Sequence, residues 1–140
     1  SSTLMFKINP DGSIAWFKNL DFSKIATFWE DSKNEIHLFA NDISEFYNKD
    51  GKFIDSDPVK IRPNSRYKPV EVILNAKTGE IISRSAITKG FEDGEVFQSF
   101  RTFRINDSLI ITPKWKQSGT SQFTRSPRQM CIIGIMNIEK

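Results

Sequence analysis

The sequence lacks several features on which common functional assignments rest. It has one cysteine, Cys131, and one histidine, His37, among 140 residues, so no internal disulfide can form. Its longest apolar stretch, Cys131–Met136, ends at Asn137 and is too short to span a bilayer. The chain also contains no glycine-rich phosphate-binding loop of the Walker type. We therefore expect neither a disulfide framework nor a transmembrane segment, and we expect Cys131 to be a small buried hydrophobic residue.

The composition is that of a globular domain or a piece of one. Apolar residues make up 38% of the chain and charged residues 26%, which excludes a disordered tail. The net charge of +3 is unevenly spread, because residues 1–100 carry 13 basic and 15 acidic side chains and residues 101–140 carry 7 and 2. A basic end can attract phosphates, but a solvated loop beside an acidic neighbour explains such an asymmetry more simply, and we favour that interpretation.

Strand patterns dominate the chain. Phenylalanine is frequent, with 12 copies, and apolar residues alternate with polar ones at a period of two around residues 4–9, 36–41 and 70–75. No segment shows a helical stripe longer than about two turns, which is short for a helix. We predict an all-β chain of antiparallel strands at about 3–20 (a hairpin), 25–30, 35–40, 69–75, 80–87, 97–105, 108–113 and 129–138.

Three segments share one turn pattern. Each has an apolar strand end, an asparagine, a short polar run, a glycine and a second apolar strand, at Asn9–Gly12, Asn48–Gly51 and Asn75–Gly79. Glycine supplies the positive φ that closes such a turn, and the asparagine side chain can hydrogen-bond the backbone at its start. The pattern predicts a β-hairpin at each place.

The third segment resembles the turn of pyrroloquinoline-quinone-type propeller repeats, whose pattern reads roughly Ala-x-Asp-x-x-Thr-Gly-x-x-x-Trp. Thr78–Gly79 matches this pattern, whereas Ile73 stands at the Ala position, Asn75 at the Asp position and Ser83 at the Trp position. No quinone-binding residue carries over. The resemblance therefore implies an architecture without implying an activity or a cofactor.

The first segment keeps the tryptophan of that pattern, because Trp16 stands four residues after Gly12. The whole chain is also similar in layout to the C-terminal part of propeller-like proteins of Bacteroidetes-type bacteria. These proteins repeat a Leu-Asp-x-Asp-Gly-x-x-x-Trp hairpin and often carry a cleavable export signal. The resemblance implies propeller-like β architecture and an extracytoplasmic location, periplasmic or at the cell surface.

The predicted strands fall into blade-sized groups. The four strands at 25–87 have the size of one propeller blade, with residues 43–67 as a probable insertion, and residues 113–128 read as a long polar loop. A closed propeller needs at least about four blades of about 40 residues, more than this chain holds. The chain begins Ser1-Ser2-Thr3 without an initiator methionine. We expect residues 1–140 to be a single all-β domain or a fragment of a larger propeller, and the alternatives are a β-sandwich or a barrel.

Residues with catalytic or metal-binding chemistry are few. His37 lies inside an alternating strand and has no second histidine or nearby cysteine, so a strand-surface or hydrogen-bonded role is favoured over a catalytic one. Carboxylates are plentiful in the turns, but no pattern marks any of them as facing inward. We predict no catalytic residue, no metal site and no cofactor.

The most suggestive surface combines cations and aromatic rings near the C-terminal end. Its candidate binding residues are Lys114, Trp115, Lys116, Phe123, Arg125 and Arg128, with Arg66 and Tyr67 as a smaller cluster. Such side chains can stack on bases or sugars while pairing phosphates. In the alternative, which we favour, the rings fold back onto the sheet and the charges keep a loop soluble.

We predict a non-enzymatic interaction module that presents residues 43–67 and 113–128 to a protein or carbohydrate partner, because function on such scaffolds resides in loops. One alternative is part of a glycan-processing enzyme whose site is completed by missing blades. Another is a nucleic-acid-binding domain that uses the basic C-terminal region. Other parts of the same protein are also possible partners.

Overall fold

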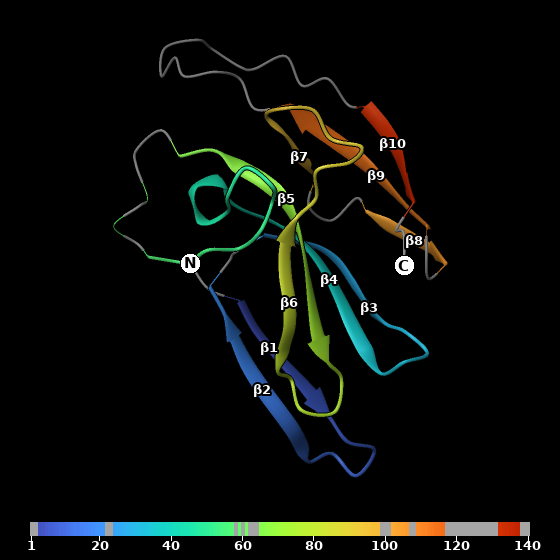
Figure 1. Cartoon of the computed structure of the whole chain (residues 1–140). Coiled ribbons are helices and arrows are strands. Elements are labelled where there is room, and N and C mark those ends of the chain that lie inside the picture. Colours follow the sequence, from blue (N-terminus) through green and yellow to red (C-terminus); the bar gives the residue numbers. More distant parts are fainter. Residues whose placement is uncertain are drawn as a thin grey trace, which may run out of the picture.

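The computed structural model describes residues 3–21, 24–57, 59, 61, 65–98, 102–106, 109–116 and 132–137, and within them it is all-β (Figure 1). The strands are β1 (Thr3–Ile8), β2 (Ile14–Leu20), β3 (Lys24–Glu30), β4 (Glu35–Ile43), β5 (Tyr67–Asn75), β6 (Ile81–Ala86), β7 (Glu95–Phe97), β8 (Phe103–Asn106), β9 (Leu109–Lys116) and β10 (Ile132–Asn137). A 3-10 turn, η1 (Ser44–Phe46), follows β4. The described part of the chain has no helix long and apolar enough to cross a membrane.

The strands form three antiparallel sheets. Strands β1 and β2 pair as a hairpin, the middle sheet has the order β3-β4-β5-β6, and the third has the order β10-β9-β7 with β8 also paired to β9. The predicted four-stranded group is thereby confirmed, and none of the sheets closes into a barrel. The single strand predicted at 97–105 is wrong, because β7 and β8 pair with different parts of β9.

The middle sheet is buried on both faces, and this is where the core lies (Figure 1). Alternate residues of a strand point to opposite faces, so β4 and β5 read as nearly continuous apolar runs. One face packs against the β1–β2 hairpin through Trp16, Leu20, Ile36, Leu38, Ala40, Val70, Val72 and Leu74. The other face packs against the third sheet through Ala26, Trp29, Phe39, Phe97 and Ile110.

The three predicted glycine turns have the expected backbone. Gly12, Gly51 and Gly79 have φ values of 86°, 80° and 73°. The amide of each glycine donates to the carbonyl of the asparagine that opens its turn. In the third turn the Asn75 side chain also accepts hydrogen bonds from the amides of Lys77 and Thr78. The sequence pattern therefore identifies all three turns.

The predicted insertion at residues 43–67 and the predicted loop at residues 113–128 have different outcomes. The segment between β4 and β5 packs against the core, where Phe46 and Tyr47 are buried. Residues 113–116, predicted as the start of a long loop, are instead the end of β9, so that part of the prediction is wrong. They form a strand because β10 pairs with them on one side and β7 on the other. Residues 117–128 lie outside the described residues.

The β1–β2 hairpin and the third sheet each carry exposed apolar side chains on the face turned away from the middle sheet. On the hairpin these are Leu4, Phe6, Ile8, Ile14 and Phe17, and on the third sheet they include Phe103 and Ile105. On β1 the residues alternate strictly between half-buried and exposed, so one face seals the core and the other faces outward. Contiguous exposed apolar patches of this kind are typical of surfaces that contact another protein or another part of the same one.

Candidate functional site

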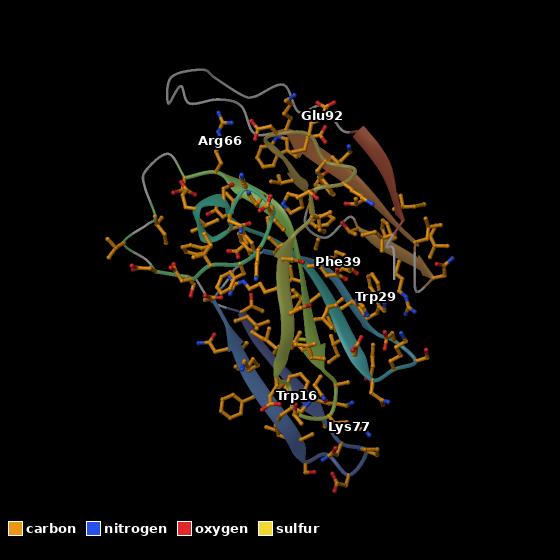
Figure 2. The ribbon with its side chains drawn as sticks, in the orientation of Figure 1. Trp16, Trp29, Phe39, Arg66, Lys77 and Glu92 are labelled. Carbon is orange, nitrogen blue, oxygen red and sulfur yellow. The ribbon has the colours of Figure 1, made fainter. Side chains whose placement is uncertain are left out.

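Two of the sequence-predicted clusters come together at one end of the molecule. Arg66 precedes β5, and Lys114 and Lys116 lie on β9. The segment 90–95, which leads into β7, lies between them and contacts both. Figure 2 shows Arg66 and Glu92 at this end, far from the Trp16 end of the hairpin. We call this region the ion-paired end.

Each cation of the ion-paired end has a carboxylate partner. Lys114 Nζ lies 2.9 Å from Glu95 Oε2, in a pair whose glutamate side chain is only 3% exposed. Two longer and more exposed contacts accompany it, Lys116 to Glu92 at 3.4 Å and Arg66 to Asp93 at 3.5 Å. Glu92, Asp93 and Glu95 therefore form ion pairs with Lys116, Arg66 and Lys114.

The aromatic rings of the same clusters are partly exposed. Tyr67 is 39% exposed at the start of β5, and Trp115 is 36% exposed on β9. Trp115 alternates with Ile110 and Thr112, which are buried toward the middle sheet, so its side chain lies on the outward face. Phe123, Arg125 and Arg128, the remaining predicted binding residues, lie outside the described residues.

The buried Glu95 makes the ion-paired end sensitive to pH. Burial alone would raise the pKa of Glu95, but the Glu92 amide and the Lys114 ammonium lower it below its ordinary value of 4.5. A carboxyl group whose pKa is lowered by folding stabilises the fold above its ordinary pKa, and this stabilisation disappears as the pH falls through the lowered value. Glu95→Gln should therefore cost about 1.5–3 kcal/mol at pH 7, the usual range for a hydrogen bond to a charged group.

Urea unfolding at pH 7, 5 and 3.5 tests this expectation. The difference between wild type and Glu95→Gln should shrink as the pH falls from 5 to 3.5, because the Glu95 carboxyl group of the unfolded chain takes up a proton around its ordinary pKa of 4.5. Glu92→Gln serves as the matched control, since the Glu92 side chain is 75% exposed and its loss should change little at any pH. A difference between Glu95→Gln and wild type that stays the same at every pH would contradict the assignment.

A second polar cluster surrounds the single histidine, near the start of β4. His37 Nδ1 lies 2.9 Å from Glu71 Oε1, and His37 Nε2 lies 3.0 Å from Asp31 Oδ2. The imidazole is buried, with 8% of its side chain exposed, and Trp29 stacks on it at 5.8 Å. His37 is thus hydrogen-bonded in the strand, in agreement with the role favoured from the sequence.

The two carboxylates favour the charged form of the imidazole. Burial alone would lower the pKa of His37, but hydrogen bonds and charge interactions with Glu71 and Asp31 raise it above 6.5. Burial would likewise raise the pKa of Asp31, but the bonds from His37 and from the amides of Glu35 and Lys33 lower it to about 2. Both ring nitrogens of His37 thus face carboxylate oxygens, an arrangement that favours the charged imidazolium over the neutral ring.

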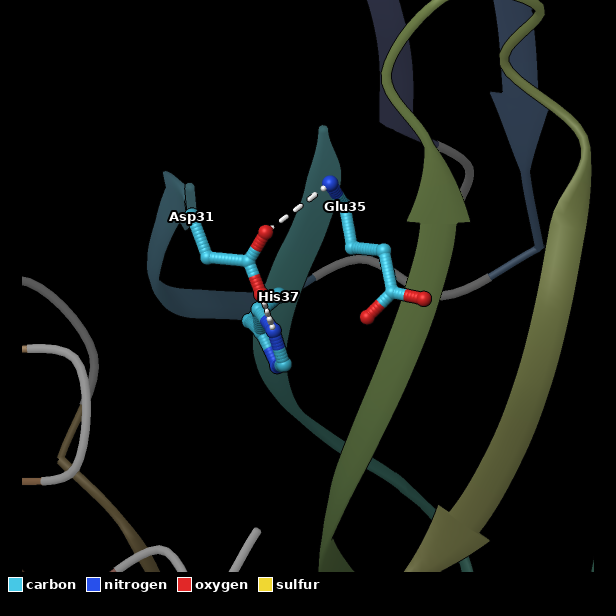
Figure 3. Close-up of side chains that lie close together, drawn as sticks. All are labelled: Asp31, Glu35 and His37. Carbon is cyan, nitrogen blue, oxygen red and sulfur yellow. Dashed lines mark hydrogen bonds and ion pairs between the residues drawn. The ribbon is translucent and has the colours of Figure 1, made fainter. Parts of the chain in front are cut away.

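Glu35 completes this cluster (Figure 3). Ligand atoms of Asp31, Glu35 and His37 all lie within 4.8 Å of one another. Sequence reasoning considered His37 alone and did not connect it with Asp31, Glu35 or Glu71. The turn before β4 was a usable signal for the Asp31 contact, whereas Glu71 is 34 residues away and is placed only by the register of β4 and β5.

Comparisons with protein-family models, with curated proteins and with solved structures give no match to this chain. The interpretation of both clusters therefore rests on their geometry.

Proposed function

We propose that this protein is a non-enzymatic interaction module that engages a protein or carbohydrate partner at the ion-paired end. The observation that carries the proposal is the combination of exposed Tyr67 and Trp115 with cations that are already neutralised by residues 92–95. Exposed aromatic rings provide contact area at low cost in side-chain entropy. Paired charges around them supply hydrogen-bonding groups without a strong field of one sign.

We further propose that the scaffold is propeller-like. Its support is the face-to-face packing of three antiparallel sheets together with the contact between Trp16 and the Gly79 turn, where Trp16 Nε1 donates to the Ala76 carbonyl at 3.0 Å. The outward apolar faces of the hairpin and of the third sheet suit further sheets of the same kind, from this protein or from a partner.

Binding measurements on Trp115→Ala and Tyr67→Ala test the proposed surface. Trp16 and Trp29 are buried, so Trp115 is the most exposed tryptophan, and in wild type and Tyr67→Ala its fluorescence should respond to soluble polysaccharides or a pulled-down protein partner. Titration calorimetry measures the affinity of Trp115→Ala, which lacks this reporter. Removing an aromatic ring from the centre of an interface costs more than about 1.4 kcal/mol, which corresponds to a tenfold loss of affinity. Phe28→Ala is the matched control, because Phe28 is an exposed aromatic on β3. Unchanged affinity in both test variants would refute the proposed surface.

The alternatives have less support. The affinity for a nucleic-acid partner would fall steeply with salt, and Lys114, the least exposed of the described candidate cations, is already held by the buried Glu95 carboxylate. A glycan-cleaving site requires a general acid with a raised pKa, whereas the pKa values of the buried carboxyl groups of Asp31 and Glu95 are lowered.

A further inference from the structure

The turn between β3 and β4 holds one carboxylate in a fixed orientation. Asp31 Oδ1 accepts hydrogen bonds from the amides of Lys33, at 2.8 Å, and Glu35, at 3.1 Å. The backbone closes the same turn, because the Asp31 amide donates to the Glu35 carbonyl at 2.9 Å and Asn34 has a φ of 60°. With Oδ1 engaged by the turn, Oδ2 is left to face His37 (Figure 3).

The imidazole of His37 is oriented by a second carboxylate, that of Glu71. Glu71 Oε1 lies 2.9 Å from His37 Nδ1, so the other ring nitrogen, Nε2, faces Asp31. A carboxylate on the far nitrogen of a histidine is the arrangement that orients metal-binding histidines and strengthens them as ligands. Trp29, stacked on the ring, fixes its plane. Two potential ligand atoms are therefore positioned before any ion arrives.

The spacing of these atoms suits a metal ion. Two ligand atoms that are each about 2.1 Å from a metal lie about 3.0 Å apart at a right angle and about 3.4 Å apart at the tetrahedral angle. His37 Nε2 and Asp31 Oδ2 are 3.0 Å apart, and a Glu35 oxygen lies within 4.8 Å of both. Ligands of one ion lie at most about 4.2 Å apart, so a rotation of the Glu35 side chain brings its carboxylate to the same ion. We propose that Asp31, Glu35 and His37 form a binding site for a divalent transition-metal cation such as Zn²⁺, with Glu71 positioning His37.

The charges around the site favour a cation. Asp31, Glu35 and Glu71 carry three negative charges against at most one positive charge on His37. Among the described residues, no lysine or arginine forms an ion pair with any of these carboxylates, and the Glu35 carboxylate has no hydrogen-bond partner. Glu35 thus keeps both oxygens available. A bound dication would take the place of the Nε2 proton, which passes to solvent.

The donor set selects the class of metal. One imidazole nitrogen with carboxylate oxygens suits Zn²⁺ and its first-row neighbours, whereas Mg²⁺ prefers oxygen ligands alone. Three protein ligands also leave at least one position on the metal for water or for a group of a partner molecule.

Zinc titration of the untagged chain tests the site, with the His37 imidazole observed by NMR. Because the chain has one histidine, its ring gives one set of signals, and Zn²⁺ should move them saturably at one equivalent while Mg²⁺ should not. Glu35→Gln removes a ligand without removing a hydrogen bond of the fold and should weaken binding at least tenfold. Glu71→Gln should weaken it by about 10–100-fold.

Two further variants keep the result interpretable. Glu30→Gln removes a negative charge next to Asp31 from a side chain that is 42% exposed and paired with Lys7, and it should leave the affinity for Zn²⁺ within about twofold of wild type. His37→Gln should abolish one-equivalent binding, and its circular dichroism shows whether it remains folded. Imidazole signals that do not move with Zn²⁺, or equal binding by wild type and Glu35→Gln, would overturn the proposal.

Discussion

Replacing Arg84 by alanine is expected to lower the free energy of unfolding by about 3–5 kcal/mol, because it leaves a buried carboxylate without its partner. Arg84 Nη2 lies 2.6 Å from Asp42 Oδ2, and the two side chains are only 7% and 2% exposed. The guanidinium also donates to the Tyr47 hydroxyl at 3.0 Å and lies over the Phe53 ring. One side chain on β6 thereby joins β4 to the segment that connects β4 and β5.

The electrostatics of this network explain the size of the effect. Burial alone would lower the pKa of Arg84, but its interactions with Asp42 and Tyr47 outweigh burial and raise the pKa above its ordinary value. Burial and the neighbouring Asp42 carboxylate raise the pKa of Tyr47. At neutral pH Arg84 is therefore a cation between the buried Asp42 carboxylate and the half-exposed Asp21 carboxylate, which lies 2.9 Å from its Nη1, and Tyr47 is a neutral hydroxyl. A loss of about 3–5 kcal/mol is a large fraction of the roughly 5–15 kcal/mol by which a domain is stable.

Urea unfolding of Arg84→Ala, of Arg66→Ala and of a double-mutant cycle at Arg84 and Asp42 separates this network from ordinary surface pairs. Arg66→Ala, which breaks a pair with side chains 50% and 97% exposed, should change the stability by at most about 1 kcal/mol. The double variant Arg84→Met with Asp42→Asn should be less destabilised than the two single changes added together, because it leaves no buried unpaired charge. Equal effects of Arg84→Ala and Arg66→Ala would show that the Arg84 pair contributes no more than a surface contact.

The sequence predicted the turns and most strands because their signals are local. An asparagine and a glycine a few residues apart fix a turn, as in Asn75–Gly79, and alternation along a strand fixes which residues face the core. The prediction failed at residues 113–116, where the polar residues around Trp115 outweighed the pairing of β9 with strands on both sides. Pairing is a tertiary property, so composition alone could not reveal it.

The polar clusters were less predictable, because their members come from distant parts of the chain. His37 meets Glu71 only because of the register in which β4 and β5 pair. His37 lies opposite Ile73, and Glu71, two residues before Ile73 on β5, lies on the same face of the sheet as His37. A shift of this register by one residue would turn Glu71 to the other face of the sheet. The pairing of Lys114 with Glu95 depends in the same way on the register of β7 and β9.

Replacing Gly79 by alanine is expected to destabilise the fold by about 3–5 kcal/mol, through the loss of a close contact between two sheets. A Cβ atom at Gly79 would lie 2.6 Å from Trp16 Cε3, nearer than real Cβ atoms come to any neighbour. The Trp16 ring would have to leave the turn, and its hydrogen bond to the Ala76 carbonyl would break. Displacing a buried tryptophan costs about as much as truncating it, which is about 3–5 kcal/mol.

Gly12 provides the matched control for this substitution. Its φ of 86° resembles the 73° of Gly79, but a Cβ atom there would meet nothing within 4 Å. Gly12→Ala should therefore cost only the left-handed backbone conformation, about 1–2 kcal/mol, and the excess at Gly79 measures the contact with Trp16. In a double-mutant cycle by urea unfolding, Gly79→Ala should cost no more than Gly12→Ala once Trp16→Ala is present, because the ring that it would strike is gone. If Gly79→Ala and Gly12→Ala destabilise wild type equally, Trp16 does not hold the hairpin against the middle sheet at this turn, and the main support for a propeller-like stack is lost.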